Sequence, residues 1–204
     1  MLFSDPSEIS TYNCFESKEL NSPVVVGRGN YSSDLMLIGE APGAMEEKLS
    51  LPFVGRSGQL LNSLIDFAGF DHEKDVYICN LVKTRPPNNR VPTMDEISLH
   101  LPWLYQQIKL VNPLIIILIG STALRTILKL KSRISKVRGT WHIWYGIHVM
   151  PIFHPAYLLR NPSKSTGQPY DLTCSDFQSI SSKLKELQSH PIRPSIFIPM
   201  ASSL

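Results

Sequence analysis

The sequence contains no apolar run of the roughly 18–20 residues that a membrane-spanning helix requires. Its longest apolar run, residues 114–119, has the length of a buried strand. The first residues lack a basic segment followed by an apolar one, so we expect no secretion signal. The cysteines, Cys14, Cys79 and Cys174, are few and irregularly spaced, which argues against a disulfide framework. These absences favour a protein of the reducing cytoplasm.

Strong charge of either sign is also missing. The 204 residues carry 20 Lys and Arg against 17 Asp and Glu, a formal net charge of +3. This balance does not by itself identify a nucleic-acid partner. Basic residues are nevertheless concentrated in two segments, 83–90 and 160–164, that we expect to be loops. Loops commonly present phosphate-contacting side chains, so both segments are candidates for binding a nucleic-acid backbone.

Apolar runs and helical spacings alternate along the chain. Short buried strands are expected at 35–38, 76–80 and 114–119, with a hairpin at 141–150. Helices are expected at 57–68, 93–110, 121–130 and from residue 175 on. A capping box of Thr93 and Glu96 opens the second helix, and the hairpin should turn at Gly146. This alternation predicts a mostly parallel sheet with helices on both faces, which is a three-layer α/β arrangement.

The chain shows no internal repeat that would divide it. We expect one domain over residues 1–190 and a proline-containing, poorly ordered tail over 191–204. Three long loops, at 40–56, 81–92 and 151–166, each follow an expected strand. Because ligands bind at the carboxyl ends of parallel strands, these loops should gather on one rim of the sheet. Each loop alone has an ordinary structural explanation, such as a tight turn or a rigid connector.

Four sequence blocks in and beside these loops together resemble the family 4 uracil-DNA glycosylases. The blocks read GEAPG at 39–43, LPFVGRSGQLL at 51–61, NLVKTRPPNNR at 80–90 and HPAYLLR at 154–160. The similarity extends from about Cys14 to the final helix. It implies an α/β/α sandwich and an enzyme that flips uracil out of DNA and hydrolyses its N-glycosidic bond, leaving an abasic site.

The resemblance assigns base-binding roles to four residues. Phe53 matches the aromatic residue on which the flipped uracil stacks. Asn80 matches the asparagine that bonds the uracil edge, where a side-chain amide both donates and accepts. Gly39 and Ala41 belong to the loop beside the base. Other branches of the superfamily have an aspartate where Ala41 stands, but family 4 has alanine or glycine, so Ala41 does not argue against activity.

Bond cleavage leaves positive charge on the sugar and negative charge on the departing uracil. His154 matches the catalytic histidine of the family, whose imidazole would stabilise the uracil. A carboxylate would stabilise the sugar and activate a water, and Glu40 and Glu46 are the candidates. Glu46 is preferred for this role, and Glu40 would then hold its loop or contact the base.

DNA contacts are expected from the two later blocks. Phosphate and backbone contacts would come from the first of these, through Lys83, Arg85, Asn88, Asn89 and Arg90. The second would insert a wedge into the space left by the flipped base, made of Tyr157, Leu158, Leu159 and Arg160. Each wedge residue could equally be a hydrophobic anchor of its loop.

The chain departs from the family at the iron–sulfur site. Family 4 enzymes hold a [4Fe–4S] cluster with four cysteine thiolates. The matching positions here are Cys14, Ser17, Thr84 and His100. We therefore predict no cluster and no other metal cofactor, since zinc on Cys14 and His100 would have two of its four ligands. Apolar packing is expected to replace the cluster, through Phe15, Leu20, Leu101 and Trp103.

Two other functions stay open on the sequence alone. A protein of this fold could bind uracil or damaged DNA without cleaving it. A glycosylase of this fold could act on another deaminated base, such as hypoxanthine or xanthine. The combination of Phe53, Asn80 and His154 favours the enzyme for uracil. We expect a monomer whose partner is uracil-containing DNA, with no membrane association, and the sequence identifies no protein partner.

Overall fold

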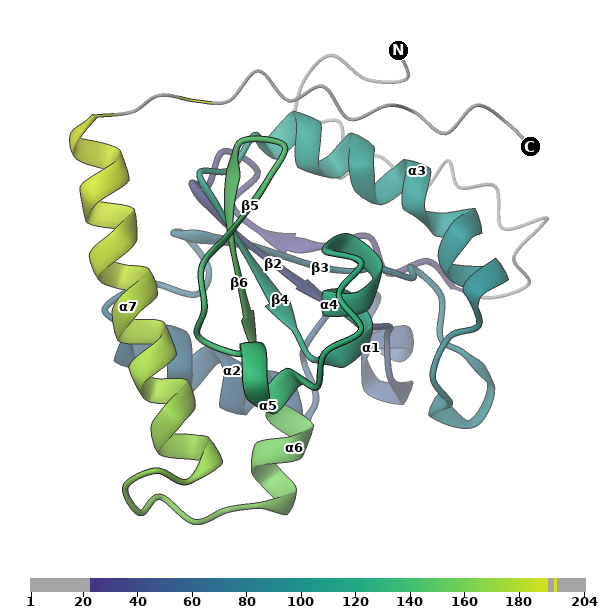
Figure 1. Ribbon diagram of the computed structural model, residues 1–204. Helices are drawn as coiled ribbons and strands as arrows, with labels where there is room; N and C mark the ends of the chain where they lie inside the picture. The colour runs from purple at the N-terminus through teal and green to yellow at the C-terminus, as the bar shows by residue number, and fades with distance from the viewer. Residues whose placement is uncertain (1–22, 191–192, 194–204) are drawn as a thin grey trace.

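The computed structural model describes residues 23–190 and residue 193 (Figure 1). Apart from Arg193, the tail expected at 191–204 lies outside the described residues. The same holds for four residues discussed above, Cys14, Phe15, Ser17 and Leu20. The domain bounds of 1–190 therefore stay a prediction.

A six-stranded sheet forms the centre of the described part of the chain. Its strands are β1 (Arg28–Gly29), β2 (Leu35–Gly39), β3 (Val76–Asn80), β4 (Ile115–Ile119), β5 (His142–Trp144) and β6 (Ile147–Ile152). They lie in the order β1-β3-β2-β4-β6-β5. The four inner strands are parallel, whereas β1 and β5 are antiparallel edge strands. The expected mostly parallel sheet is confirmed.

Helices cover both faces of this sheet. They are α1 (Ala44–Leu49), α2 (Arg56–Phe67), α3 (Met94–Val111), α4 (Ser121–Ile127), α5 (Ile134–Val137), α6 (Pro155–Arg160) and α7 (Pro169–Ser189). In Figure 1, α2 and α7 lie on one side of the sheet, and α3 and α4 lie on the other. The three-layer sandwich expected from the sequence is therefore confirmed.

The central strand β2 shows how two cores form around one sheet. Leu35 and Leu37 belong to the apolar cluster that also contains side chains of α2 and α7. Met36 and Ile38 belong to the cluster that contains side chains of α3 and α4. Alternate side chains of a strand point to opposite faces, and both faces are covered here. A strand buried in this way has a continuous apolar sequence, as the 114–119 run does.

Several local expectations are confirmed. Thr93 and Glu96 form the capping box at the start of α3, because Thr93 Oγ1 accepts from the Glu96 N–H and the Glu96 carboxylate accepts from the Thr93 N–H. The β5–β6 hairpin turns at Tyr145 and Gly146, which both have positive φ angles of 47° and 83°. No described helix is both long enough and apolar enough to cross a membrane.

Other segments contain more structure than expected. The short helices α1 and α6 lie inside two of the long loops. The last helix begins at Pro169 rather than near residue 175, and Asp176, which lies inside the helix, forms an ion pair with Arg138. The glycine-rich segment 27–30, which has the composition of a turn, contains the edge strand β1. Two- and six-residue elements are too short to produce a readable periodicity.

The parallel strands bring their carboxyl ends to one rim. Gly39 at the end of β2 pairs with Asn80 at the end of β3. The Gly120 N–H, just past β4, donates to the Ile152 carbonyl at the end of β6 with an N···O distance of 3.0 Å. The segments that follow these four ends carry most of the expected site residues. A ligand site is therefore expected at this rim.

Candidate active site

Phe53 and Asn80 meet over Gly39, at the adjacent ends of β2 and β3. A Cβ atom on Gly39 would collide with both the Phe53 ring and the Asn80 side-chain oxygen. Only glycine therefore allows the aromatic face and the amide to approach the end of β2 together. The structure brings together these three residues, which come from separate blocks of the sequence.

Asn80 holds an unsatisfied hydrogen-bond acceptor. Its side chain is buried, and Oδ1 has no hydrogen-bond partner among the described residues. A buried polar atom without a partner costs about 1–3 kcal/mol, and native proteins keep such atoms rarely. An acceptor held in this way beside an aromatic ring suits a ligand that brings a planar face and an N–H group.

Phe53 is held in an unusual backbone conformation. Its φ angle is +53°, in the left-handed region that bulky residues seldom occupy. The backbone of Phe53 also touches α2, because a Cβ on Gly58 would collide with the Phe53 carbonyl group. Such strain persists only where surrounding contacts impose it.

Glu46 of α1 supplies one of those contacts. Its Oε1 accepts from the N–H groups of Val54 and Gly55, at 3.0 and 2.8 Å, and its Oε2 accepts from the Gly43 N–H at 3.2 Å. Both carboxylate oxygens are therefore bonded to backbone amides. This geometry ties α1 to the segment after Phe53 and leaves Glu46 poorly placed to activate water.

Glu40 lies directly at the end of β2 and is only partly buried. Its Oε2 accepts a hydrogen bond from the Thr122 hydroxyl in the first turn of α4. Among the described residues, no hydrogen bond engages its other carboxylate oxygen. The geometry thus favours Glu40 over Glu46 as the carboxylate that faces a substrate, which reverses the sequence-based preference.

His154 follows β6 and caps α6. Its Nδ1 accepts from the Ala156 N–H at 3.1 Å, so the hydrogen of the neutral ring is on Nε2. Burial, with a smaller contribution from Arg160, lowers the pKa of His154 to about 4. The ring packs against Gly120, and its centroid lies 6.1 Å from that of Phe53. His154 is therefore a neutral N–H donor beside the base-binding residues at neutral pH.

Ala41 lies next to this group, but its methyl packs against the apolar cluster under α3 and α4. It adds no polar group to the site. Of the residues expected to hold the base or carry the chemistry, the rim brings together Gly39, Glu40, Phe53, Asn80 and His154.

The prediction that Lys83 contacts a DNA phosphate is wrong. Its side chain is 1% exposed, and its ammonium donates to the Asn80 carbonyl at 2.6 Å and to Gln107 Oε1 at 2.5 Å. Burial lowers the pKa of Lys83 below its ordinary value. The sequence could not indicate this, because Gln107 comes from α3, far along the chain. Lys83 instead supports the backbone that carries Asn80.

The tip of that loop, residues 87–90, is open to solvent. Asn88 and Asn89 are exposed and have positive φ angles of 56° and 55°. Arg85 donates to Glu47 at 3.1 Å and to Asn89 at 2.7 Å, and exposed Arg90 pairs with Glu96 at 2.7 Å. These arginines are thus fixed by carboxylates on α1 and α3. Their contact with DNA stays a prediction.

The expected wedge is the helix α6 rather than a loop. Tyr157 and Leu159 are each 38% exposed, and Arg160 is exposed as well. Leu158, in contrast, is 1% exposed and belongs to the apolar cluster that contains α2 and α7. The expected DNA contact of Leu158 is therefore wrong, because successive residues of a helix point in different directions.

Thr84 and His100 occupy two of the positions where relatives would place cluster thiolates. Thr84 Oγ1 lies 3.4 Å from His100 Nε2, and the Lys83 N–H donates to His100 Nδ1 at 3.4 Å. Burial lowers the pKa of His100 to about 4. No group of three His, Cys, Asp or Glu side chains within the described ranges could hold a metal. A hydroxyl and a neutral imidazole do not fit an iron–sulfur cluster, which takes thiolate ligands.

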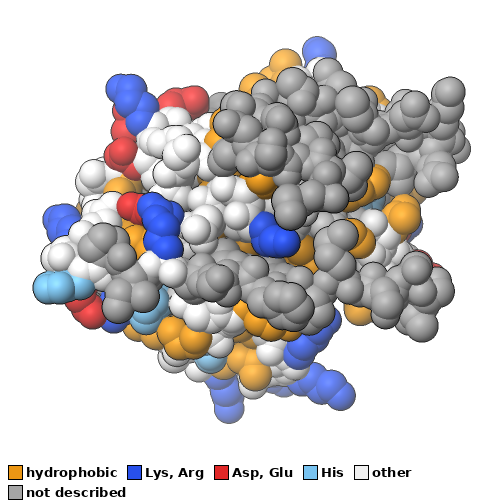
Figure 2. All heavy atoms as spheres, turned by 90° about the horizontal axis from the view of Figure 1, so that it is seen from above, with side chains coloured by type: hydrophobic (Ala, Val, Ile, Leu, Met, Phe, Trp, Pro, Cys, Tyr) orange, Lys and Arg blue, Asp and Glu red, His pale blue; other side chains and the backbone are white. Residues whose placement is uncertain are grey.

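Figure 2 looks onto the face away from α6, where the described Lys and Arg side chains appear at several places and the Asp and Glu side chains appear mainly on the left.

Comparison with known proteins agrees with this geometry. The model of the uracil DNA glycosylase superfamily matches residues 26–184, a span that contains the whole rim. The chain is 49% identical over 142 residues to the type-4 uracil-DNA glycosylase of Thermotoga maritima, covering 69% of this chain and 73% of that protein. It is 46% identical to the type-4 enzyme of Saccharolobus solfataricus, with 68% of each chain covered. For the type-4 enzyme of Archaeoglobus fulgidus the identity is 36%, over 76% of this chain and 79% of the other.

Proposed function

This chain belongs to the uracil DNA glycosylase superfamily, and we propose that it repairs DNA by excising uracil through hydrolysis of the N-glycosidic bond. The observation that carries the proposal is the buried Oδ1 of Asn80, which lies beside the Phe53 ring and has no hydrogen-bond partner among the described residues. The N3–H group of an extruded uracil supplies the missing donor, and the base supplies a planar face for the ring. Uracil binding would thus remove the cost of the orphaned acceptor.

The leaving group would be stabilised by His154. As the N–glycosidic bond breaks, negative charge develops on the uracil oxygens. The Nε2–H of neutral His154 donates to this charge, while Nδ1 stays bonded to the Ala156 N–H. Because the pKa of His154 is about 4, the ring is neutral at neutral pH. It would therefore act through the N–H that the neutral ring carries. The role is that of an oriented neutral donor.

The sugar and the attacking water would be served by Glu40. Its bond from Thr122 orients the carboxylate, and its second oxygen is available to a water on the sugar. A carboxylate there also stabilises the positive charge that develops on the sugar. Glu46 would act indirectly, because its carboxylate accepts three hydrogen bonds from backbone amides and so holds the segment that presents Phe53.

The proposed enzyme works without an iron–sulfur cluster. Its four aligned positions offer one thiol, two hydroxyls and one imidazole, which is not a set that binds [4Fe–4S]. Described residues nearby support a replacement by packing, because the Trp103 ring meets the His100 ring edge-on at 5.2 Å and Leu101 packs against the core. Cys79 is a free, buried thiol, as suits a reducing cytoplasm. A monomeric state stays a prediction.

A panel of oligonucleotides tests the proposal. Strands that contain a single uracil, hypoxanthine, xanthine or thymine are incubated with excess protein, and the released base is measured. We expect the wild type to release uracil. Asn80→Leu should reduce this release about 100-fold or more, because the hydrogen bonds from the Asn80 side-chain amide to the uracil are lost. Folded protein that binds the uracil strand without releasing base would make it a binding protein. Faster release of a deaminated purine would reassign the substrate.

A further inference from the structure

The guanidinium of Arg28 reaches from the edge of the sheet to the loop that presents Phe53. Arg28 lies in β1, where it pairs with Ile78 of β3. Its side chain is 8% exposed although it is charged. Nε donates to the Pro52 carbonyl at 2.9 Å, and Nη2 donates to the Phe53 carbonyl at 3.5 Å. The two carbonyls on either side of the strained Phe53 backbone are therefore bound by one rigid group.

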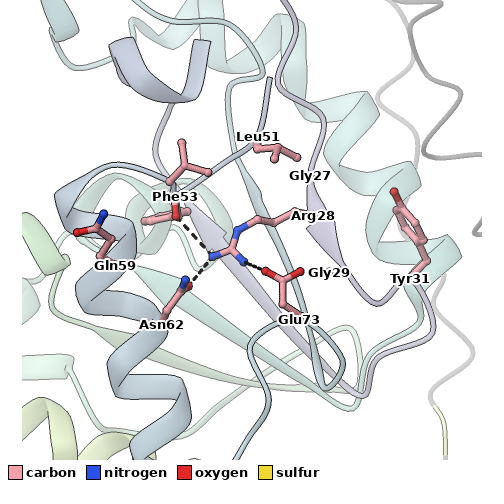
Figure 3. A pocket seen from close by; sticks show the side chains of 10 residues that line it. Gly27, Arg28, Gly29, Tyr31, Leu51, Phe53, Gln59, Asn62 and Glu73 are labelled. Atoms are coloured by element: carbon pink, nitrogen blue, oxygen red, sulfur yellow. Dashed lines mark hydrogen bonds and ion pairs between the residues drawn. The ribbon is translucent and has the colours of Figure 1, made fainter. Parts of the chain in front are cut away.

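Two further residues fix the guanidinium itself. Asn62 of α2 accepts from Nη2 at 2.5 Å through Oδ1, and Glu73 accepts from Nη1 at 3.4 Å. Figure 3 shows these partners converging on Arg28 from α2 and from the loop before β3. The planar fork of arginine presents several donors in fixed directions, which a lysine ammonium does not. Arg28 thus fixes the loop relative to the sheet and to α2 through hydrogen bonds.

A pocket opens beside Arg28 and is lined by Tyr31, Leu51, Phe53 and Gln59, among others (Figure 3). Leu51 is itself 43% exposed, so it does not anchor the loop in the core. Glu46 holds the amides that follow Phe53, and Arg28 holds the carbonyls around it. The carboxylate of Glu46 and the guanidinium of Arg28 therefore bind different backbone groups of the same short segment.

From this geometry we infer that Arg28 is a positioning residue for base excision, which keeps Phe53 in its left-handed conformation so that the ring faces Asn80 and His154. The inference rests on the proposed function of Phe53 as the stacking residue. The hydrogen bonds of the Arg28 guanidinium go to the loop and to its own two supporting residues. Its effect on catalysis should therefore pass through Phe53 alone.

Arg28→Lys tests this, because it keeps the charge and removes the fork. Arg193→Lys is the matched control, since Arg193 also bonds a backbone carbonyl, that of Asn112, and a carboxylate, that of Asp34, away from the loop. We expect single-turnover uracil release to fall by about 10- to 100-fold in Arg28→Lys, as for a misplaced binding group. The control should stay within about twofold. Amide hydrogen exchange in residues 51–56 should become faster only in Arg28→Lys.

A double-mutant cycle separates positioning from general destabilisation. If Arg28 acts through Phe53, adding Arg28→Lys to Phe53→Leu should cost little further activity. Multiplied losses, or unchanged exchange in the loop, would overturn the inference. If Arg28→Lys does not fold, Asn62→Ala is used instead, because it removes one hydrogen-bond acceptor of the Arg28 guanidinium. Uracil release and amide hydrogen exchange are then measured for this variant. If the wild type releases no uracil, the proposed function fails, and loop exchange alone decides whether Arg28 holds the segment.

Discussion

At the scale of single residues, the site depends on which polar atoms are left over. Among the described residues, Asn80 keeps an unpartnered acceptor, Glu40 keeps a carboxylate oxygen and His154 keeps an N–H, while the second carboxylate oxygen of Glu40 and Nδ1 of His154 are bonded within the protein. Protein bonds that fix one end of a group orient its other end before the substrate arrives. Such preorganisation is a large source of catalytic power, because no reorganisation is needed as charge develops.

The two glutamates provide a prediction at this scale. Glu40→Gln should slow single-turnover uracil release by about 10²–10⁴-fold with little change in stability, because a water-activating carboxylate is lost. Glu46→Gln should slow release by about tenfold and lower the free energy of unfolding by about 1–2 kcal/mol, because one of the two oxygens that accept from backbone amides is replaced by an NH₂ donor. Parallel kinetics and urea unfolding measure both effects. A larger kinetic loss in Glu46→Gln at unchanged stability would restore Glu46 as the base.

The grouping of site residues was predictable where it followed from the blocks that match the family. Phe53, Asn80 and His154 were found in this way, and the structure places them together. The burial of Lys83 and the bonds of Arg28 were not predictable. Both depend on partners from distant segments, and a lysine or arginine in a polar stretch looks the same whether it faces solvent or the core.

At the scale of elements, long elements were predictable and short ones were not. The apolar runs of β2, β3 and β4 and the capping box of α3 are local signals, and each is confirmed. Helices α1 and α6 have six residues each, too few to reveal a periodicity, so their segments had the appearance of loops. Helical structure matters most in α6, where it decides which expected wedge residues face solvent.

Neighbouring leucines of α6 make a matched pair. Leu158→Ala should lower the free energy of unfolding by about 2–4 kcal/mol, because it leaves a cavity in the core. Leu159→Ala should change stability by less than about 0.5 kcal/mol but weaken binding to DNA. Urea unfolding and titration with a uracil strand that carries a cleavage-blocking 2′-fluorine measure the two quantities. Equal affinity of Leu159→Ala and wild type would remove this residue from the DNA interface.

At the scale of the whole molecule, the fold gathers segments spread over more than a hundred residues onto one rim. The sheet order places the ends of β2, β3, β4 and β6 side by side, so that Gly39, Asn80, Gly120 and His154 meet. Buried bonds also link the rim to the helical layers, through Lys83 to α3 and through Glu40 to α4. This connectivity holds the site by packing and hydrogen bonds of the chain itself.

We propose that this scaffold excises uracil without an iron–sulfur cluster. The most direct test is single-turnover uracil release by wild-type protein purified in the presence of a chelator, with iron and sulfide measured on the same sample. We predict complete uracil release by protein with only substoichiometric iron, and no gain after treatment with iron and sulfide. Folded, iron-free protein that releases no uracil, or that gains activity together with bound iron and sulfide, would contradict cluster-free excision.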